Sequence, residues 1–234
     1  MESAEREMWV VRLGRMGYEE CLELQREVAR QRISGAIPQD VLLLVEHPPV
    51  VTLGRASKQK NLVSSPDFLR SCGVELFEVE RGGDVTFHGP GQLVGYPVFD
   101  LKRHKQDLHW YLRSVEEAII RIIGEYGIPG ERSTGYTGVW TRGRKIASIG
   151  VHARDWVTWH GFALNVTTDL SYFDLIVPCG IVGVEMTSIE KEAGVSVSVD
   201  SVSDAAARHF GDVFDLPVIE AASESLLRTT PARY

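Results

Sequence analysis

The order of strand-like and helix-like segments constrains the fold of this chain more than any other feature. Helical spacing of apolar residues marks three long stretches, at 18–33, after Asp107 and at 201–214. Short apolar segments typical of strands lie at 8–13, 41–46, 50–53, 74–79, 84–87, 92–99, 139–141, 144–152 and 157–166. Because the two kinds do not alternate strictly, we predict an α/β (α+β) fold, a mixed or antiparallel β-sheet flanked by helices.

The helix after Asp107 has the clearest start and end. Asp107 is a favourable N-cap residue, and Gly127 and Pro129 terminate the helix. We expect its buried side to carry Leu108, Leu112, Val115, Ile119, Ile122 and Ile123.

The size and charge of the chain restrict its organisation and its partners. With 234 residues, we expect a single domain over 1–234, with its core at about 8–216 and a loose polar tail at 221–234. The formal net charge of -7 lacks the excess of Lys and Arg that a nucleic-acid partner requires.

Sequence features also predict a cytoplasmic location. Residues 1–7 are polar and lack the apolar region of a signal peptide, and no apolar stretch is long enough to cross a membrane. The three cysteines are widely spaced and form no CxxC pair, so we expect free thiols in a reducing compartment and no thiolate zinc site.

A glycine-rich segment, Arg81–Gln92, is the most unusual part of the sequence. Four glycines within it permit sharp turns and a close approach of the backbone to a ligand. Its spacing matches neither GxGxxG nor a GK[ST] phosphate loop, so we expect it to line a cleft. Two tight hairpin turns are the structural alternative.

Three cysteines compete for the role of nucleophile. Cys21 lies on the apolar stripe of a helix and fits a core position, and Cys72 precedes a glycine in a loop. Cys179 lies between Pro178 and Gly180, where a loop can present a thiol to a pocket.

Lys145 and several histidines are candidate proton carriers. Strand alternation places Lys145 on the same face as Ala147 and Ile149, with Ser148 on the other face. A lysine in a partly buried cleft can exchange a proton near neutral pH. His88, His152 and His160 leave a Cys–His hydrolase open, whereas the absence of HExxH argues against a metal.

Three motifs in order resemble the lipoyl(octanoyl)transferase family. They are RGGDVTFHGPGQLVGYPVFDL at 81–101, GRKIASIGVHARDWVTWHGFALNV at 143–166 and PCGI at 178–181. The resemblance covers about 8–216. It implies the class II synthetase-like fold of biotin protein ligases and lipoate ligases, and a single catalytic domain that acts as a monomer without a cofactor.

The resemblance also implies an activity and a set of site residues. Family members move an octanoyl group from acyl carrier protein to a lysine of lipoyl domains, in 2-oxoacid dehydrogenase complexes and in the glycine cleavage H protein. Matching positions make Cys179 the acyl-bearing nucleophile and Lys145 its acid/base partner. The implied substrate-binding residues are Arg81, Gly82, Gly83, Asp84, Val85, Thr86, Phe87, His88, Ser148, Ile149, Gly150, Gly161, Phe162 and Ala163.

Three other parts of the mechanism remain expectations. An oxyanion would need donors, for which the backbone N–H groups near Cys179 and Gly180 or the side chain of His88 are candidates. Small side chains at Gly150, Gly161 and Ala163 would leave room for the acyl chain. An acidic carrier protein calls for a basic patch, and the candidates are Lys102, Arg103, Lys105, Arg142 and Arg144.

Three alternative functions use the same residues differently. An ATP-dependent lipoate or biotin ligase would need no cysteine, a Cys–His thioesterase or amidase would release the acyl group to water, and a binding module would only hold an acylated carrier. The products and the ATP requirement distinguish them.

Overall fold

A seven-stranded mixed sheet forms the centre of the computed structural model, which describes residues 6–181 and 183–227. Its strand order is β10-β1-β2-β6-β9-β8-β7. β1 pairs in parallel with β2 and β10, and the other neighbours pair antiparallel. The bounds are β1 Met8–Arg15, β2 Asp40–Glu46, β6 Gln92–Val98, β7 Gly138–Thr141, β8 Arg144–Arg154, β9 Val157–Asn165 and β10 Val218–Glu220. The predicted mixed sheet is confirmed.

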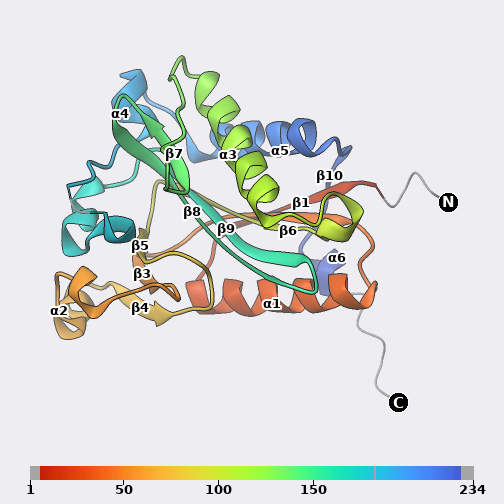
Figure 1. The fold of residues 1–234 in the computed structure, drawn as a ribbon, viewed down its shortest axis with the longest axis horizontal. Coiled ribbons are helices and arrows are strands. Elements are labelled where there is room, and N and C mark those ends of the chain that lie inside the picture. Colours follow the sequence, from red (N-terminus) through yellow and green to blue (C-terminus); the bar gives the residue numbers. More distant parts are fainter. Residues whose placement is uncertain (1–5, 182, 228–234) are drawn as a thin grey trace.

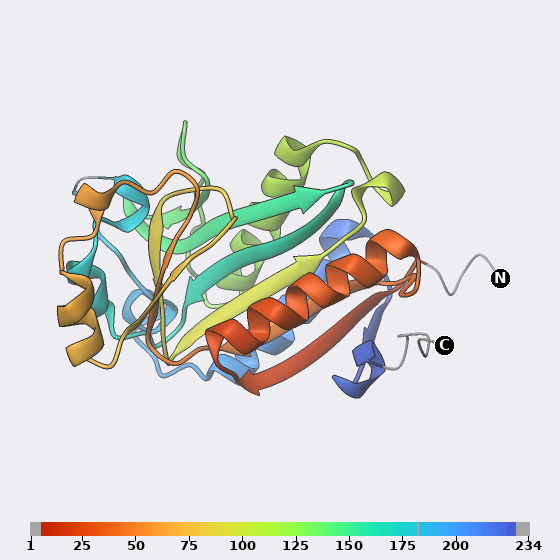
Figure 2. The same cartoon turned by 90° about the horizontal axis from the view of Figure 1, so that it is seen from below.

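Helices cover both faces of this sheet (Figures 1 and 2). One face packs against α3 (Leu108–Gly124) and α5 (Val199–Phe214), and the other packs against α1 (Tyr18–Ser34). Alternate residues of each strand feed the two cores, as Leu42 joins the α3 side and Leu43 joins the α1 side. Burial of apolar side chains on both faces explains why the central strands read as almost continuous apolar runs.

A smaller sheet lies beside one end of the main sheet, at the left of Figure 1. Its order is β4-β3-β5, from Glu75–Glu78, Val50–Leu53 and Val85–His88. The short helices of this part of the chain and of the segment after β9 are α2 (Pro66–Ser71), α4 (Ile189–Ala193) and the 3₁₀ turns η1 (Gln59–Asn61), η3 (Leu170–Leu175) and η4 (Pro178–Gly180). An apolar cluster that includes Val85, Phe87 and Phe173 joins this sheet to η3.

The helix α3 confirms its predicted cap but not all of its predicted buried side. Asp107 accepts a hydrogen bond from the backbone N–H of Trp110, as an N-cap carboxylate should. Leu108, however, is 40% exposed, because it faces an open cavity rather than the core. The prediction for Leu108 was therefore wrong, while Val115, Ile119, Ile122 and Ile123 are fully buried.

The expected loose tail was also wrong for residues 221–227. Ala221 donates its backbone N–H to Val10 O, and α6 (Glu224–Leu227) follows. Leu226 is fully buried in the core beneath α1, and this burial fixes the segment. The remainder of the predicted tail lies outside the described residues.

A buried charge cluster ties α1 to the start of β2. Asp40 accepts from Arg32 at 2.6 Å and from His104 at 2.5 Å, and these side chains are 7% exposed or less. Asp40 also accepts the backbone N–H of Asp100. Two elements and the turn after β6 therefore depend on one carboxylate.

We predict that Asp40→Ala lowers the free energy of unfolding by about 3–5 kcal/mol, because it leaves the Arg32 charge buried without its partner. Urea unfolding measures this change. The control is Asp67→Ala, which removes an exposed pair with Arg70 and should cost about 1 kcal/mol or less. Equal effects of the two substitutions would contradict the prediction.

Candidate active site

A cavity of about 410 Å³ lies between the end of the main sheet and the small sheet. Its lining includes Lys145, Cys179 and most of the predicted substrate-binding residues: Arg81, Gly82, Gly83, Asp84, Thr86, His88, Ser148, Ile149, Gly150, Gly161, Phe162 and Ala163. Val85 and Phe87 instead belong to the apolar cluster against η3, since alternation along β5 turns them away. Nothing in the local sequence indicated Tyr18, Tyr96, Leu112 or Tyr136, which also line the cavity.

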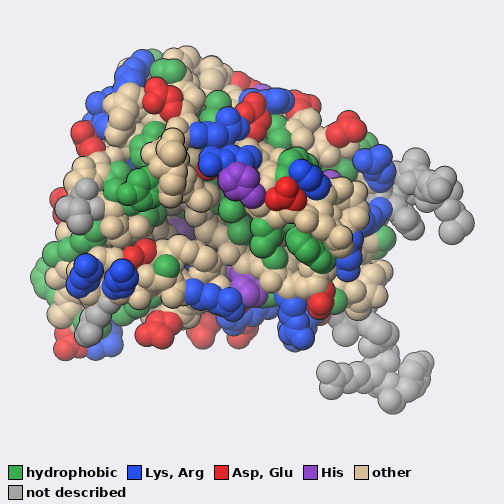
Figure 3. All heavy atoms as spheres, in the orientation of Figure 1, with side chains coloured by type: hydrophobic (Ala, Val, Ile, Leu, Met, Phe, Trp, Pro, Cys, Tyr) green, Lys and Arg blue, Asp and Glu red, His purple; other side chains and the backbone are tan. Residues whose placement is uncertain are grey.

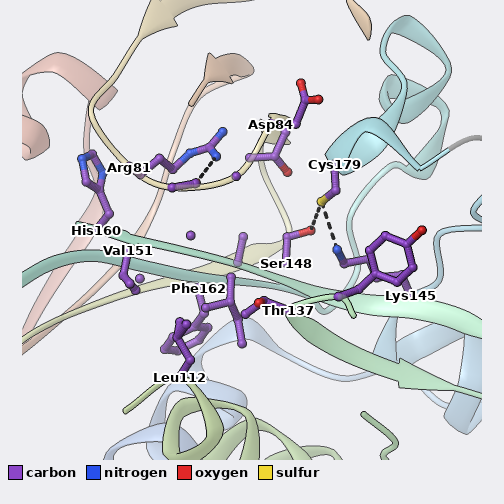
Figure 4. Close-up of a pocket in the computed structure, with 18 of the residues that line it drawn as sticks. Arg81, Asp84, Leu112, Thr137, Lys145, Ser148, Val151, His160, Phe162 and Cys179 are labelled. Atoms are coloured by element: carbon purple, nitrogen blue, oxygen red, sulfur yellow. Dashed lines mark hydrogen bonds between the residues drawn. The ribbon is translucent and has the colours of Figure 1, made fainter. Parts of the chain in front are cut away.

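Lys145 and Cys179 meet at one end of the cavity (Figure 4). The Nζ of Lys145 lies 2.9 Å from the Sγ of Cys179, and the Oγ of Ser148 lies 3.8 Å from the same sulfur. Lys145 is 1% exposed, and its Nζ sits 4.8 Å from the centroid of the Trp140 ring. An ammonium beside a thiol favours the thiolate, which is the nucleophilic form of cysteine.

The backbone around Lys145 brings this pair together. The N–H of Lys145 donates to Glu185 O at 2.8 Å, and the N–H of Thr187 donates to Lys145 O at 2.9 Å. The segment that follows the Cys179 loop therefore runs parallel to β8 at Lys145. These main-chain hydrogen bonds hold the segment after Cys179 against Lys145, close to the contact between Lys145 Nζ and Cys179 Sγ.

A bulge in β8 corrects the predicted strand faces. Val139 pairs with Ala147 while Trp140 pairs with Lys145, so one extra residue, Ile146, is inserted into β8. Ile146 and Ala147 both enter the core, and Lys145 and Ser148 both turn towards Cys179. The predicted grouping of Lys145 with Ala147, opposite Ser148, was wrong because simple alternation does not survive a bulge.

Cys179 has an unusual backbone conformation. Its φ is 55°, and that of Gly180 is 66°, both in the left-handed region. A Cβ on Gly180 would lie 2.5 Å from Asp84 Oδ2, an oxygen that accepts from the side chain of Asn61 at 2.5 Å. The Cys179 loop is thus pressed against Asp84 and Asn61, which fixes the direction of the thiol.

Arg81 is buried over the floor of the cavity. Its Nη2 donates to the O and Oγ1 of Thr52, and burial lowers its pKa. A Cβ on Gly150 would lie 2.8 Å from Gly82 O and 3.1 Å from Arg81 Cδ. Gly150 therefore permits this segment to pack directly on β8, and it also lines the cavity, as Gly161 and Ala163 do.

The histidines of the cavity are poorly placed as bases for Cys179. Burial lowers the pKa of His88 to about 3, and its Nδ1–H donates to Gln92 Oε1, which leaves Nε2 without a proton in the neutral ring. His160 is buried, its pKa is lowered by burial, and its Nε2 lies 3.7 Å from Glu80. Within the described residues, the hydrogen bonds to the Cys179 sulfur come from Lys145 and Ser148.

Two of the expected oxyanion donors are engaged elsewhere. The N–H of Gly180 donates to Val177 O at 2.9 Å, and a neutral His88 of this tautomer accepts rather than donates at Nε2. The Ser148 hydroxyl, absent from our candidates for this role, lies beside the sulfur and can donate.

The predicted basic patch is also occupied. Arg142 and Arg144 both pair with Glu192, whose pKa the Arg144 hydrogen bond holds at about 2. Lys102 pairs with Asp100, and Lys105 pairs with Asp107. Arg103 donates to the backbone O of Pro38. These residues stabilise turns of the fold, which the charge pattern alone did not reveal.

The described residues offer no grouping of three or more His, Cys, Asp or Glu side chains suited to a metal ion. Within the same residues, no helix has the length and apolar character needed to cross a membrane.

Comparisons with known proteins agree with this geometry. Residues 17–211 match the family described as Lipoyl protein ligase A/B catalytic domain. A protein of Solibacter usitatus named Octanoyltransferase is 50% identical over 211 residues, which cover 90% of this chain and 94% of that protein.

Solved structures confirm the class II synthetase-like fold implied by the sequence. The crystal structure of lipoate-protein ligase A bound with ATP superimposes with a TM-score of 0.77 at 18% identity, covering 95% of this chain and 93% of that one. Biotin protein ligase from Aquifex aeolicus gives a TM-score of 0.50 at 10% identity, covering 89% of this chain and 69% of that one.

We predict that Gly180→Ala slows alkylation of Cys179 by iodoacetamide about tenfold, because the new methyl group meets Asp84 and moves the thiol away from Lys145. Mass spectrometry of the labelled cysteine measures the rate. Gly183→Ala is the matched control: its φ is 77°, and a Cβ there meets no atom within 4 Å. Equal rates in both variants would contradict the role of the Asp84 contact.

Two buried histidines predict how stability depends on pH. Burial lowers the pKa of His47 to about 4, and that of His88 to about 3, whereas an unfolded histidine binds a proton near about 6.5. Their contribution is complete above about pH 6.5 and falls as the pH drops towards 4, because the unfolded chain takes up protons that the folded protein does not. Urea unfolding at several pH values measures this decline.

His47→Gln should make that decline shallower, since one such group is then absent. His109→Gln, at an exposed position, is the control and should retain the steeper decline. A decline that is the same in both variants would show that burial of His47 does not govern it.

Proposed function

This chain belongs to the lipoyl protein ligase A/B and octanoyltransferase family, and we propose that it moves an octanoyl group from acyl carrier protein to a lysine of a lipoyl domain through a thioester on Cys179. It is an acyltransferase enzyme. The observation that supports this route is the 2.9 Å contact between Lys145 Nζ and Cys179 Sγ inside the cavity.

The first half-reaction exchanges one thioester for another. The Cys179 thiolate attacks the carbonyl carbon of the donor, a new C–S bond forms, and the donor thiolate leaves. Lys145, 2.9 Å from the sulfur, holds the proton that the leaving thiolate receives. The exchange is nearly isoenergetic and needs no ATP. Covalent catalysis lets the donor protein leave before the acceptor arrives.

The second half-reaction forms an amide. The acceptor amine attacks the thioester carbon, Lys145 takes a proton from the attacking nitrogen, the C–N bond forms and the C–S bond breaks. Cys179 leaves as a thiolate beside the protonated Lys145, which restores the starting pair. The Ser148 hydroxyl, 3.8 Å from the sulfur, is close enough to assist the oxygen of the tetrahedral intermediate after a small movement.

We place the acyl chain in the cavity, against the strands β8 and β9 of the main sheet. Ser148 pairs with Ala163 next to the sulfur, and Gly150 pairs with Gly161 two residues further on. A chain lying in this cavity gains roughly 0.8 kcal/mol for each CH₂ removed from water. We place the reaction in the cytoplasm, because a thiol nucleophile needs a reducing compartment. We also propose that the enzyme acts as a monomer.

We predict that incubation with octanoyl-acyl carrier protein, without ATP, adds one octanoyl mass to the denatured protein on Cys179. Cys179→Ala should carry no adduct and transfer nothing to a lipoyl domain. Cys72→Ser, which changes an exposed cysteine outside the cavity, should retain both activities. Lys145→Met should slow transfer by ~10²–10⁴-fold.

Other outcomes would identify the alternative reactions. A strict requirement for ATP and free octanoate, with no adduct, would assign ligase chemistry. Free octanoate as the sole product from the carrier would assign a thioesterase.

A further inference from the structure

The segment 54–61 packs on the glycine-rich loop that lines the cavity, and its Arg55 and Lys58 line a neighbouring pocket. The backbone N–H groups of Arg55 and Ala56 donate to Arg81 O and Gly83 O, both at 3.0 Å. At its other end, Asn61 O accepts the N–H of Val177 at 2.8 Å, two residues before Cys179. This segment therefore bridges the glycine-rich loop and the loop that carries the thiol.

Three cationic side chains lie on the segment 54–61: Arg55, Lys58 and Lys60. We call them the basic rim. All three are exposed. Across residues 6–181 and 183–227, none of them takes part in a salt bridge. In Figure 3, groups of basic side chains lie along the lower margin of the central hollow. Most exposed arginine and lysine side chains of the described residues form a salt bridge. Three neighbouring cations without one are therefore distinctive.

Cations elsewhere near the cavity are already neutralised. On α3 and the loop before β7, Arg113 and Arg132 pair with the buried Glu116. Arg142 and Arg144 pair with Glu192. The remaining side chains at that mouth are apolar or aromatic, with Leu108 40% and Tyr136 49% exposed. The basic rim therefore carries positive charges that no salt bridge among the described residues neutralises, on the segment packed against the glycine-rich loop.

We propose that the basic rim docks the acidic face of the octanoyl carrier protein and directs its thioester arm onto Cys179. This inference rests on the proposed function. The segment that carries the basic rim contacts the Cys179 loop through the hydrogen bond between Asn61 and Val177. A carrier protein held at the rim therefore delivers its thioester arm near the Cys179 sulfur. Exposed charge complementarity of this kind mainly accelerates encounter and is screened by salt.

The test combines Arg55→Glu, Lys58→Glu and Lys60→Glu in one variant of the full chain. Acylation of Cys179 by octanoyl-acyl carrier protein should fall tenfold or more in kcat/KM, mainly through KM, and lose most of its salt dependence. Octanoyl-pantetheine carries the same thioester without a protein surface, so its rate should not change. The KM for the lipoyl-domain acceptor should also remain unchanged.

A matched variant carries Arg30→Glu, Arg121→Glu and Arg208→Glu on α1, α3 and α5, with the same change in net charge. It should acylate from the carrier at the original rate. An unchanged carrier reaction in the rim variant, an equal loss in the matched variant, or a rise only in the acceptor KM would overturn the proposal. Failure of the unmodified enzyme with both thioesters would instead refute the proposed function.

Discussion

The main-chain pairing of Lys145 with residues 185–187 is the constraint on which the site depends. It holds β8, the Cys179 loop and α4 in one arrangement. Thr187 donates its hydroxyl to Glu192, and Glu192 also receives Arg144 beside Lys145. The buried side chain of Lys145 loses its hydration. Its contacts with the Cys179 sulfur and with the Trp140 ring offset part of that loss. Lys145 is therefore fixed within β8, and the Cys179 loop is held against it.

The small sheet supplies the roof that the main sheet lacks. Thr52 of β3 receives the guanidinium of Arg81, and this contact spreads the glycine-rich segment over β8 and β9. The same segment carries Asp84, which abuts Gly180. One segment thus lines the cavity and contacts the Cys179 loop, so the shape of the cavity and the position of the thiol share the same support.

The fold is shared with a lipoate-protein ligase A whose crystal structure was determined bound with ATP, whereas the reaction that we propose needs no ATP. A fold fixes where a site lies, and the side chains fix the reaction. In this chain the cavity contains a thiol with a lysine at hydrogen-bonding distance, which suits acyl transfer between thioesters. On our proposal, the basic rim adds recognition of the carrier protein, because its unpaired positive charges lie on the segment that contacts the Cys179 loop.

The sequence by itself determined the elements and the chemistry-bearing segments. Periodicity located the helix after Asp107 and the strands of the main sheet to within a few residues, because burial on one or two faces dictates local apolar spacing. The three motifs named Cys179, Lys145 and most of the cavity lining. Tertiary structure alone decided which faces these residues present: the bulge at Ile146 reversed the expected grouping of Lys145 and Ser148, and Val85 and Phe87 turned into a neighbouring core. Tertiary structure also decided which charges are paired. Glu192 lies 48 residues from Arg144 in sequence and forms a salt bridge with it. Arg55, Lys58 and Lys60 form no salt bridge among the described residues. Local patterns record spacing along the chain, whereas pairing of strands and charges depends on contacts between distant segments.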